Sequence, residues 1–249
     1  MQKLKIYDIN IHSFSIKELE NIFTKILISS DQTHLITTFN LDFLRNATIN
    51  KYFFKICKNA FLNLPDGIGI IHLLKTKYHI KIERITGNDI FPLLLKMAND
   101  NKYRVVLVGS TKTVLDKVEL KIRNRYKNLN NNLLCISPIF HFEYDEKLNM
   151  EIVNEIKFFK PDIVFVALGS PRQEIWLYQN MNIFHSKINI GIGAVFDFFS
   201  GEKRRSPIVF QKLGLEWLWR LSKEPTRLFK RYIIYDLPFF LKSILYKNY

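Results

Sequence analysis

The sequence contains little cysteine and no long apolar stretch. Its 249 residues include two cysteines, Cys57 and Cys135, and neither belongs to a C-x-x-C pair. Two thiols this far apart make no disulfide framework, which favours a reduced, cytosolic setting. The first residues carry charges where an export signal needs an apolar core, so we expect no export signal. No run of about 18 uncharged apolar residues occurs, so any membrane contact is predicted to be peripheral.

Several catalytic and cofactor-binding patterns are also missing. The sequence has no H-E-x-x-H, no metal-spaced cluster of His or Cys, no G-x-S-x-G elbow and no P-loop. Gly67-Ile-Gly69 and Gly191-Ile-Gly193 lack the third glycine of a dinucleotide fingerprint. No D-x-D pair occurs, by which many nucleotide-sugar enzymes hold a divalent metal. We therefore expect no metal site and no cofactor, and helix N-termini and arginines would have to hold any diphosphate.

The composition is that of a globular protein with a marked excess of positive charge. Hydrophobic residues make up 47% of the chain and charged residues 24%, which is enough for a sizeable core. The net charge is +14. Such a field favours nucleic acid, nucleotide-linked substrates or an acidic membrane surface, and does not choose among them. We find neither aromatic stacking platforms nor a known nucleic-acid-reading module, so no nucleic-acid partner is expected.

Short apolar runs alternate with helical patterns along the first 200 residues. This alternation is typical of βα units and predicts an α/β fold with a Rossmann-like, mostly parallel sheet flanked by helices. Ser15-Ile-Lys-Glu18 is a capping box that predicts a helix reaching Ser29. Further helices are expected over 113–126 and 146–159. The predicted strands cover residues 35–38, 60–64, 104–108, 133–137, 162–168 and 188–192.

The character of the chain changes near residue 200, which divides it into an α/β domain (1–200) and an appendage (201–249). From Lys203 onward, eleven Lys and Arg oppose Glu216, Glu224 and Asp236, and aromatic residues interleave with the basic ones at helical spacing. The pattern predicts a basic helical appendage. This appendage either lies on anionic lipid or presents a solvated basic face over aromatic core residues.

Polar and small residues collect where the predicted strands end. In an open α/β sheet, ligands bind outside the carboxyl ends of the strands, so five such ends predict one continuous cleft. The residues concerned are Thr38 and Asn40, Pro65-Asp66-Gly67-Ile-Gly69, Gly109-Ser110, Gly169-Ser-Pro-Arg-Gln173-Glu174, and Gly191-Ile-Gly193 with Phe196-Asp197.

Three of these ends carry candidate functional residues, and each has a plainer interpretation. A partly desolvated Asp66 could accept a proton from an attacking hydroxyl, or it could cap its own loop in an Asx-type turn. The run that starts at Gly169 could bind phosphate at a helix N-terminus, or simply turn a strand into a helix. Thr38 and Asn40 could both face a bound ligand, or serve as hydrogen-bonding residues of the loop.

Seven segments of the chain carry a family pattern when they are taken together and in order. They are Thr38-Phe-Asn40, Pro65-Asp66-Gly67, Arg84-Ile-Thr-Gly87-Asn-Asp89, Gly169-Ser-Pro-Arg-Gln173-Glu174, Gly191-Ile-Gly193-Ala-Val-Phe196-Asp197, Gly201-Glu-Lys-Arg-Arg205-Ser-Pro207 and Leu215-Glu216-Trp217-Leu-Trp-Arg220-Leu. Together they resemble the WecG/TagA/CpsF glycosyltransferase family, over residues 37–232. Ser206 and Trp219 stand where the family pattern has Ala and Tyr, which are mild departures. The segment Phe196-Asp-Phe-Phe-Ser-Gly201 is more similar to exopolysaccharide members of the family than to teichoic-acid members, so the donor sugar stays open.

The resemblance implies an inverting, metal-independent transfer of a hexose or N-acetylhexosamine. The donor would be a UDP-sugar and the acceptor a polyprenyl-diphosphate-linked saccharide, in surface polysaccharide biosynthesis. It also implies a cytoplasmic protein, peripheral at the inner face of the plasma membrane, whose appendage closes over the active site and touches the membrane. Members of the family can self-associate, so a homo-oligomer is a further expectation. The alternative is a non-catalytic basic α/β protein that binds membrane or nucleic acid.

The resemblance also assigns roles to individual residues. Asp66 is the expected catalytic base, and Thr38 is implicated in catalysis beside it. The residues expected to bind the substrate are Asn40, Arg84, Asp89, Gly109, Gly169, Gln173, Glu174, Gly193, Asp197 and Arg205. Those expected to contact the acceptor diphosphate or the membrane are Arg220, Arg227 and Arg231.

Overall fold

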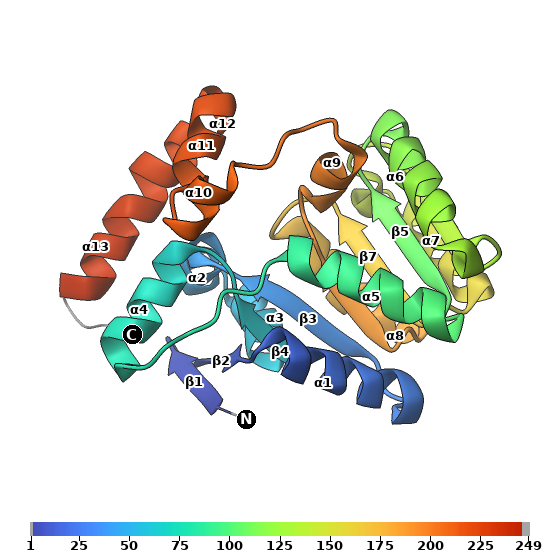
Figure 1. Cartoon of the computed structure of the whole chain (residues 1–249), viewed down its shortest axis with the longest axis horizontal. Helices are drawn as coiled ribbons and strands as arrows, with labels where there is room; N and C mark the ends of the chain where they lie inside the picture. The colour runs from blue at the N-terminus through green and yellow to red at the C-terminus, as the bar shows by residue number, and fades with distance from the viewer. Residues whose placement is uncertain (1, 246–249) are drawn as a thin grey trace.

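The computed structural model describes residues 2–245, which form an α/β fold with two sheets (Figure 1). The larger sheet has the strand order β4-β3-β8-β7-β5-β6, and every neighbouring pair in it is parallel. The predicted α/β class is therefore confirmed, and all six predicted strands are present. These strands are β3 (His34–Phe39), β4 (Leu62–Pro65), β5 (Val105–Gly109), β6 (Leu133–Ile136), β7 (Ile163–Ala167) and β8 (Ile188–Gly191).

Helices connect the strands and cover the sheet. Ser15 and Glu18 form the predicted capping box, with Ser15 N donating to Glu18 Oε2 at 2.8 Å, and α1 ends at Ser29 as expected. The helices before residue 201 are α1 (Ile16–Ser29), α2 (Leu41–Ile49), α3 (Lys51–Asn59), α4 (Ile68–Tyr78), α5 (Gly87–Asn101), α6 (Lys112–Arg125), α7 (Glu146–Phe159), α8 (Arg172–Phe184) and α9 (Val195–Ser200), with short turns η1 (Lys127–Leu129) and η2 (Phe142–Tyr144).

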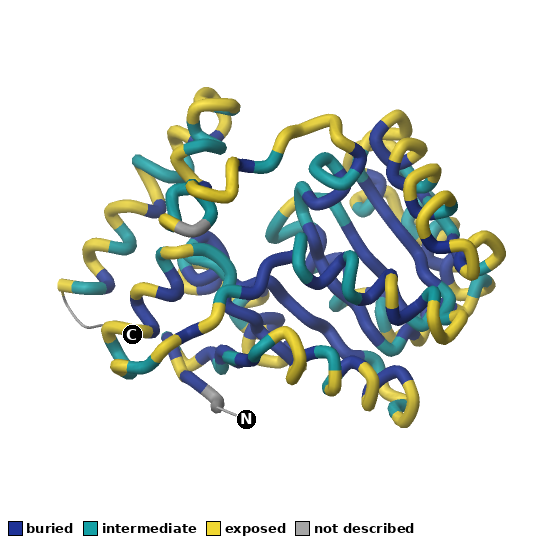
Figure 2. Tube along the Cα trace, in the orientation of Figure 1, coloured by how far each residue is buried: buried dark blue, intermediate teal, exposed yellow. Residues whose placement is uncertain are grey.

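Two apolar clusters hold the layers together, one on each face of the sheet. Because helices cover both faces, the central strands β5 and β7 are continuous apolar runs, and every residue of β5 is buried. One cluster joins the sheet to α1, α5 and α6, through residues such as Phe23 and Val118. The other joins it to α3, α7 and α8, through residues such as Phe53 and Trp176. Figure 2 shows the central strands as buried, with exposed residues on the outer faces of the helices.

The N-terminal hairpin is a feature that we did not predict. β1 (Gln2–Ile6) and β2 (Ile9–Ser13) pair antiparallel, and a two-residue turn at Tyr7 and Asp8 joins them. Both turn residues have positive φ, 46° and 64°, as in the type I′ turns that commonly join hairpin strands. Apolar residues of both strands join the core cluster beside β4.

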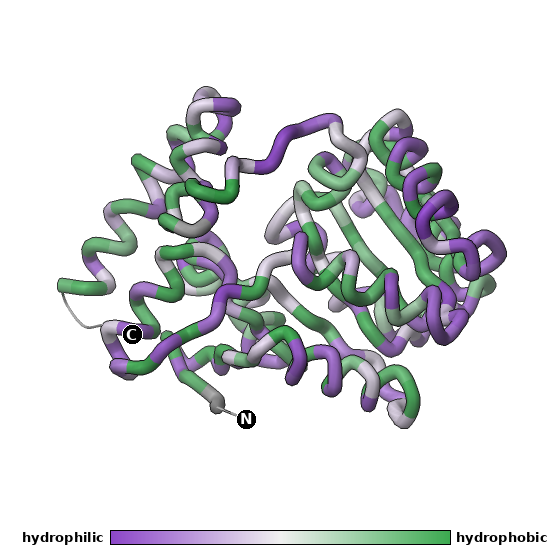
Figure 3. The backbone as a smooth tube through the Cα atoms, viewed as in Figure 1, coloured by the Kyte–Doolittle hydropathy of each residue, from purple (hydrophilic) through white to green (hydrophobic). Residues whose placement is uncertain are grey.

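The C-terminal segment, defined here as residues 201–245, forms a helical layer at the β4 side of the sheet. Residues 201–207 are hydrophilic and lead across the molecule from α9 (Figure 3). The segment then packs η3 against α2, and α13 against α4. A helical appendage is thus confirmed, while residues 246–249 of the predicted range lie outside the described residues. The elements are α10 (Ile208–Lys212), α11 (Glu216–Lys223), α12 (Pro225–Phe229), the π-helical η3 (Lys230–Asp236) and α13 (Leu237–Leu245).

Within residues 2–245, no helix combines the length and the apolar character needed to cross a bilayer.

Candidate functional site

A cavity of about 440 Å³ lies between the ends of β3 and β4 and the C-terminal segment. The body of the protein contributes the first residues of α2 and α4 and the chain before α5. The C-terminal segment contributes α11, η3 and the start of α13. The lining residues are Asn40, Leu41, Asp42, Asp66, Gly67, Ile68, Gly69, His72, Arg84, Gly214, Glu216, Trp217, Arg220, Arg231, Tyr232, Ile233, Asp236, Leu237 and Phe240.

The backbone around Asp66 places its carboxylate in this cavity. β4 ends at Pro65, and Asp66 N donates to the carbonyl of Phe39 at 2.8 Å, which ties the turn to the end of β3. Gly67 then adopts a backbone φ of +84°, which residues other than glycine rarely adopt, and α4 begins at Ile68. No described residue donates a hydrogen bond to the Asp66 carboxylate, so the Asx-type turn is not what the structure shows.

The surroundings of Asp66 raise its basicity. Burial raises the pKa of its carboxyl to about 6, while the positive charges of Arg220 and Arg84 act in the opposite direction. Glu216 and Asp89 add negative charge and reinforce the effect of burial on this pKa. The group is therefore a carboxylate at neutral pH that accepts a proton more readily than an exposed aspartate.

Arginines from separate parts of the chain meet at Glu216, the first residue of α11. Arg220 Nη2 lies 2.8 Å from Glu216 Oε1, one helical turn away, and Arg84 Nη1 lies 3.2 Å from Oε2. Arg205 Nε is 3.8 Å from Oε1. Burial would raise the pKa of Glu216, but these three arginines together hold it below its ordinary value. The cavity wall beside Asp66 is thus a cationic group arranged around one carboxylate.

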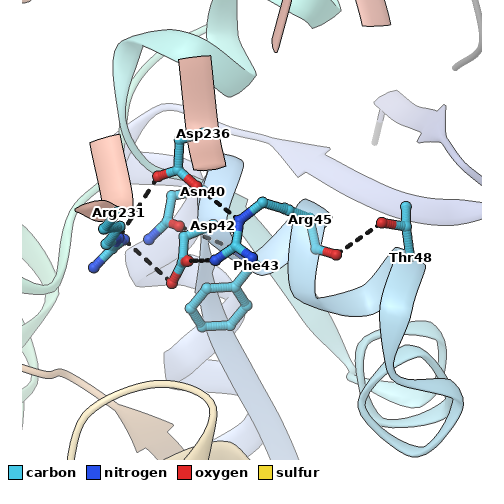
Figure 4. A network of polar contacts seen from close by, with 7 residues as sticks. All are labelled: Asn40, Asp42, Phe43, Arg45, Thr48, Arg231 and Asp236. Carbon is cyan, nitrogen blue, oxygen red and sulfur yellow. Dashed lines mark hydrogen bonds and ion pairs between the residues drawn. The ribbon is translucent and has the colours of Figure 1, made fainter. Parts of the chain in front are cut away.

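A second ion-pair network contributes Asp42, Arg231 and Asp236 to the cavity lining (Figure 4). Arg45 of α2 lies 2.5 Å from Asp42 and 2.9 Å from Asp236 of η3. Arg231 of η3 approaches the same two carboxylates, at 3.3 Å from Asp42 and 3.6 Å from Asp236. Asn40 caps α2 by accepting from Phe43 N at 3.2 Å. The network therefore fastens the C-terminal segment to α2.

The π-helical winding of η3 helps to line the cavity. Arg231 and Asp236 are five residues apart, a spacing that the wider π-helical turn brings to one side of the helix. Tyr232 and Ile233 of the same element also line the cavity. Single π-helical turns occur frequently at functional sites, and here the turn supplies four lining residues.

A different group of predicted residues gathers at the ends of β7 and β8. Gln173 Oε1 accepts from Gly169 N at 3.2 Å and from Gly193 N at 3.1 Å, which joins the two strand-end loops. Gln173 Nε2 donates to Glu174 Oε1 at 2.6 Å. Both side chains are buried, and burial raises the pKa of Glu174 to about 7. Substrate contacts by these residues stay a prediction.

The remaining predicted residues lie apart from the cavity lining. Thr38 is buried in β3, and Gly109 ends β5 with φ +108°. Asp89 caps α5 by accepting from Thr86 N and Oγ1 at 2.9 and 2.7 Å. Asp197 lies 3.4 Å from Lys203 Nζ. Arg227, with 62% of its side chain exposed, pairs with Glu224 instead.

The cavity is smaller than the cleft that the strand ends predict. Of the five predicted strand ends, those of β3 and β4 contribute residues to this cavity. One continuous cleft along all five strand ends stays a prediction. Asn40, Asp66, Arg84, Arg220 and Arg231 are the predicted residues that it brings together.

Sequence reasoning missed several residues of the cavity. Glu216 stands in the Leu215-Glu216-Trp217 segment, but nothing in its pattern shows that it pairs with an arginine 132 positions earlier. Asp42 follows the predicted site residue Asn40 by two positions, and this closeness in sequence is the one signal that could have identified Asp42 as a cavity residue. In the described part of the chain, no three His, Cys, Asp or Glu side chains are grouped so as to hold a metal ion.

Comparison with known proteins supports the resemblance seen in the sequence. Residues 4–248 match the model of the family described as "Glycosyl transferase WecG/TagA/CpsF family". Two similar proteins, from Staphylococcus aureus strains MW2 and NCTC 8325 / PS 47, are N-acetylglucosaminyldiphosphoundecaprenol N-acetyl-beta-D-mannosaminyltransferases. The first is 30% identical over 91% of this chain and 85% of its own length. The second is 32% identical over 81% of this chain and 77% of its own length. The chain therefore belongs to the WecG/TagA/CpsF family of glycosyltransferases.

Proposed function

We propose that this glycosyltransferase moves a hexose or N-acetylhexosamine from a UDP-sugar to a saccharide carried on polyprenyl diphosphate. The transfer inverts the anomeric centre and needs no metal ion. The observation that carries the proposal is the Asp66 carboxylate, which lies in a cavity walled by arginines and has a pKa raised by burial to about 6. Such a group is suited to take a proton from an attacking hydroxyl near neutral pH.

The relatives support the acceptor and the stereochemistry. Their names specify N-acetylglucosaminyl diphosphoundecaprenol as acceptor and a β-linked N-acetylmannosamine as product. A β-linked product from an α-linked nucleotide sugar requires inversion. We carry the polyprenyl-diphosphate acceptor over to this chain, and we keep N-acetylmannosamine, N-acetylglucosamine and glucose as donor sugars to be tested.

The reaction is a single displacement. The acceptor hydroxyl attacks the anomeric carbon, its oxygen forms the new glycosidic bond, and its proton passes to Asp66. The bond between the anomeric carbon and the UDP oxygen breaks, and UDP leaves with the electron pair. Arg84 and Arg220 line the same cavity as Asp66 and stabilise the developing negative charge. Each well-placed donor of this kind can contribute about 3–4 kcal/mol to the transition state.

Two glycines support a position for the donor diphosphate at the ends of β7 and β8. Gly169 and Gly193 have positive φ, and no atom lies within 4 Å of the place where either would carry a side chain. A phosphate can approach the backbone closely at such positions. The donor then extends from these loops toward Asp66, with Thr38, Asp197 and Arg205 among the residues proposed to contact it.

The C-terminal segment is suited to contact the membrane in which the polyprenyl chain of the acceptor lies. We propose a catalytic domain over residues 1–200 and an appendage over 201–249 that closes the cavity and rests on the cytoplasmic face of the membrane. The appendage exposes apolar side chains, among them Phe229, Ile234 and Leu241, next to basic residues such as Arg227 and Lys230. Apolar contact together with attraction to anionic headgroups is how peripheral helices bind bilayers.

A donor screen tests the proposed function. The purified protein is incubated with UDP-N-acetylmannosamine, UDP-N-acetylglucosamine or UDP-glucose and with N-acetylglucosamine on a short-chain polyprenyl diphosphate. Released UDP is measured, with and without a chelator, and the product anomer is assigned by NMR. We expect one donor to give acceptor-dependent UDP and an inverted product in the presence of chelator. UDP release no higher than that of Asp66→Asn with every donor contradicts the proposal.

A further inference from the structure

Glu216 has an unusual position for a residue outside the predicted site. Only 8% of it is exposed, and its two oxygens face guanidinium groups from three parts of the chain. Arg84 comes from the chain before α5, Arg205 from the hydrophilic segment 201–207, and Arg220 from α11 itself. One carboxylate therefore pairs with an arginine of the body and two arginines of the C-terminal segment, and Arg84 and Arg220 of these three line the cavity.

The three arginines keep unused hydrogen-bonding capacity. Each guanidinium has five N–H donors, whereas Glu216 offers two oxygens to all three. In the described chain, the buried Nε atoms of Arg205 and Arg220 have no hydrogen-bond partner. Buried donors without partners are costly, and an incoming anion would satisfy them. The arrangement thus resembles an anion site whose cationic groups are held in place but not neutralised.

The charges of Arg84, Arg220 and Glu216 act on Asp66, yet Asp66 forms no ion pair with any described residue. Arg84 and Arg220 lower its pKa and Glu216 raises it, which shows that the opposing charges act on the same carboxyl. Without Glu216, Asp66 would be a carboxylate of the same cavity with which Arg84 and Arg220 could pair. An Asp66 engaged by a guanidinium would be a weak base, because the ion pair stabilises its charged form.

We propose that Glu216 is a positioning residue that holds Arg84 and Arg220 in the cavity wall, with Arg205 paired to the same carboxylate, and prevents Arg84 and Arg220 from forming ion pairs with Asp66. The inference rests on the proposed function for what the freed carboxylate does. Glu216 touches neither the donor nor the acceptor in this scheme. It keeps Arg84 and Arg220 in place to stabilise the charge that develops on the departing UDP. It also leaves the Asp66 carboxylate available to the acceptor hydroxyl.

Other charged groups of the cavity also bear on the titration of Asp66. Those that act on its pKa are Arg84, Asp89, Glu216 and Arg220. Further charged or titratable groups line the same cavity from α2, α4 and η3, namely Asp42, His72, Arg231, Tyr232 and Asp236. Because these remain unchanged in a Glu216 variant, a change in the Asp66 titration can be assigned to the Glu216 group and its arginines.

The decisive experiment measures the Asp66 carboxyl directly by NMR in protein carrying ¹³C-labelled aspartate. The Asp66→Asn variant identifies its signal, and the pKa is measured in wild type, Glu216→Gln and Glu216→Asp. We expect Glu216→Gln to lower the pKa of Asp66 by about one unit or more, since a negative charge is lost and the arginines are released. Glu216→Asp keeps the charge but shortens its reach, so we expect a smaller drop in the same direction. If one variant does not fold, the other still decides.

Glu224→Gln is the matched control. Glu224 also belongs to the C-terminal segment and pairs with Lys203 and Arg227, but it does not line the cavity. We expect this variant to leave the Asp66 titration unchanged. An unchanged Asp66 pKa in the Glu216 variants, with only a lower melting temperature, would show that Glu216 is a structural clamp and overturn the proposal.

Turnover supplies a second readout where a donor has been found. We expect the acid limb of kcat/KM in Glu216→Gln to move to lower pH with the Asp66 pKa, and kcat at the optimum to fall at least tenfold as the arginines lose their placement. The NMR titration requires no substrate. Failure to find any donor would therefore contradict the proposed function, while an unchanged titration would contradict the role of Glu216.

Discussion

Arg45 Nε lies 2.9 Å from Asp236 Oδ1, which joins α2 to η3 across 191 positions of the chain. The same guanidinium holds Asp42 at 2.5 Å, so one cation bridges a carboxylate of the body and a carboxylate of the C-terminal segment. Burial raises the pKa of Asp236, and the arginines beside it oppose that effect. The closed cavity therefore depends on Arg45.

We predict that Arg45→Met lowers the free energy of unfolding by about 2 kcal/mol, because it leaves two buried carboxylates short of a partner. This loss of stability is smaller than the loss expected for breaking a fully buried ion pair, because 18% of the Arg45 side chain is exposed. Urea denaturation measures the change, and limited proteolysis should cut within 201–245 more quickly. Lys112→Met, which breaks an exposed pair with Asp116, should change stability by less than about 0.5 kcal/mol. Equal effects of the two variants would contradict the prediction.

The pH dependence of turnover is expected to report Asp66. Its raised pKa of about 6 means that the carboxyl becomes protonated, and useless as a base, as the pH falls through that value. We expect kcat/KM to fall roughly tenfold per pH unit below it. Asp66→Asn should lower kcat at least about a hundredfold and leave UDP binding, measured by calorimetry, unchanged.

Asp31→Asn is the control for this prediction, since Asp31 is exposed before β3 and far from any strand end of the cavity. It should keep the wild-type profile. Near-wild-type turnover by Asp66→Asn would show that another group takes the proton.

The sequence predicts the central sheet well because burial on both faces leaves a strong pattern. β5 and β7 are short, wholly apolar runs, and the other strands are short segments in which most residues are buried. The hairpin of β1 and β2 was missed because its strands are short and its turn, Tyr7-Asp8, lacks the glycine or asparagine that usually marks a two-residue turn. Its pairing depends on packing beside β4 rather than on local turn chemistry.

The cavity is less predictable because distant residues complete it. Asp66 and Asn40 follow strands, so the rule that ligands bind at carboxyl ends of strands identifies them. No comparable sequence rule identifies Glu216 and Asp236, because they reach the cavity only when the C-terminal segment packs on α2 and α4. Gln173 was predicted as a pocket residue, but its amide joins two loops, a use that only the packed loops reveal.

Glu174 is predicted to make stability depend on pH. Its folded-state pKa of about 7 lies above the ordinary value of 4.5, so between these pH values the folded carboxyl binds a proton that the unfolded one has lost. Stability from this group is therefore present at low pH and declines as pH rises toward 7. We expect Glu174→Gln to be more stable than wild type by about 2–3 kcal/mol at pH 8, with little difference below pH 4.5. Urea denaturation at both pH values tests this, with exposed Glu151→Gln as a control that should match wild type.

Membrane binding is predicted to depend on the exposed apolar residues of the C-terminal segment. Ile234 and Leu241 are 51% and 49% exposed, so burying their exposed halves in a bilayer interface contributes on the order of 1 kcal/mol each. We expect wild type to co-sediment with vesicles of phosphatidylcholine and phosphatidylglycerol, less so at high salt. The double variant Ile234→Glu with Leu241→Glu should bind more than tenfold more weakly. The double variant Leu120→Glu with Phe158→Glu adds the same two charges on α6 and α7, at side chains that are 62% and 89% exposed, and should bind as wild type does. If both variants lose binding equally, general charge rather than the C-terminal segment governs membrane attachment.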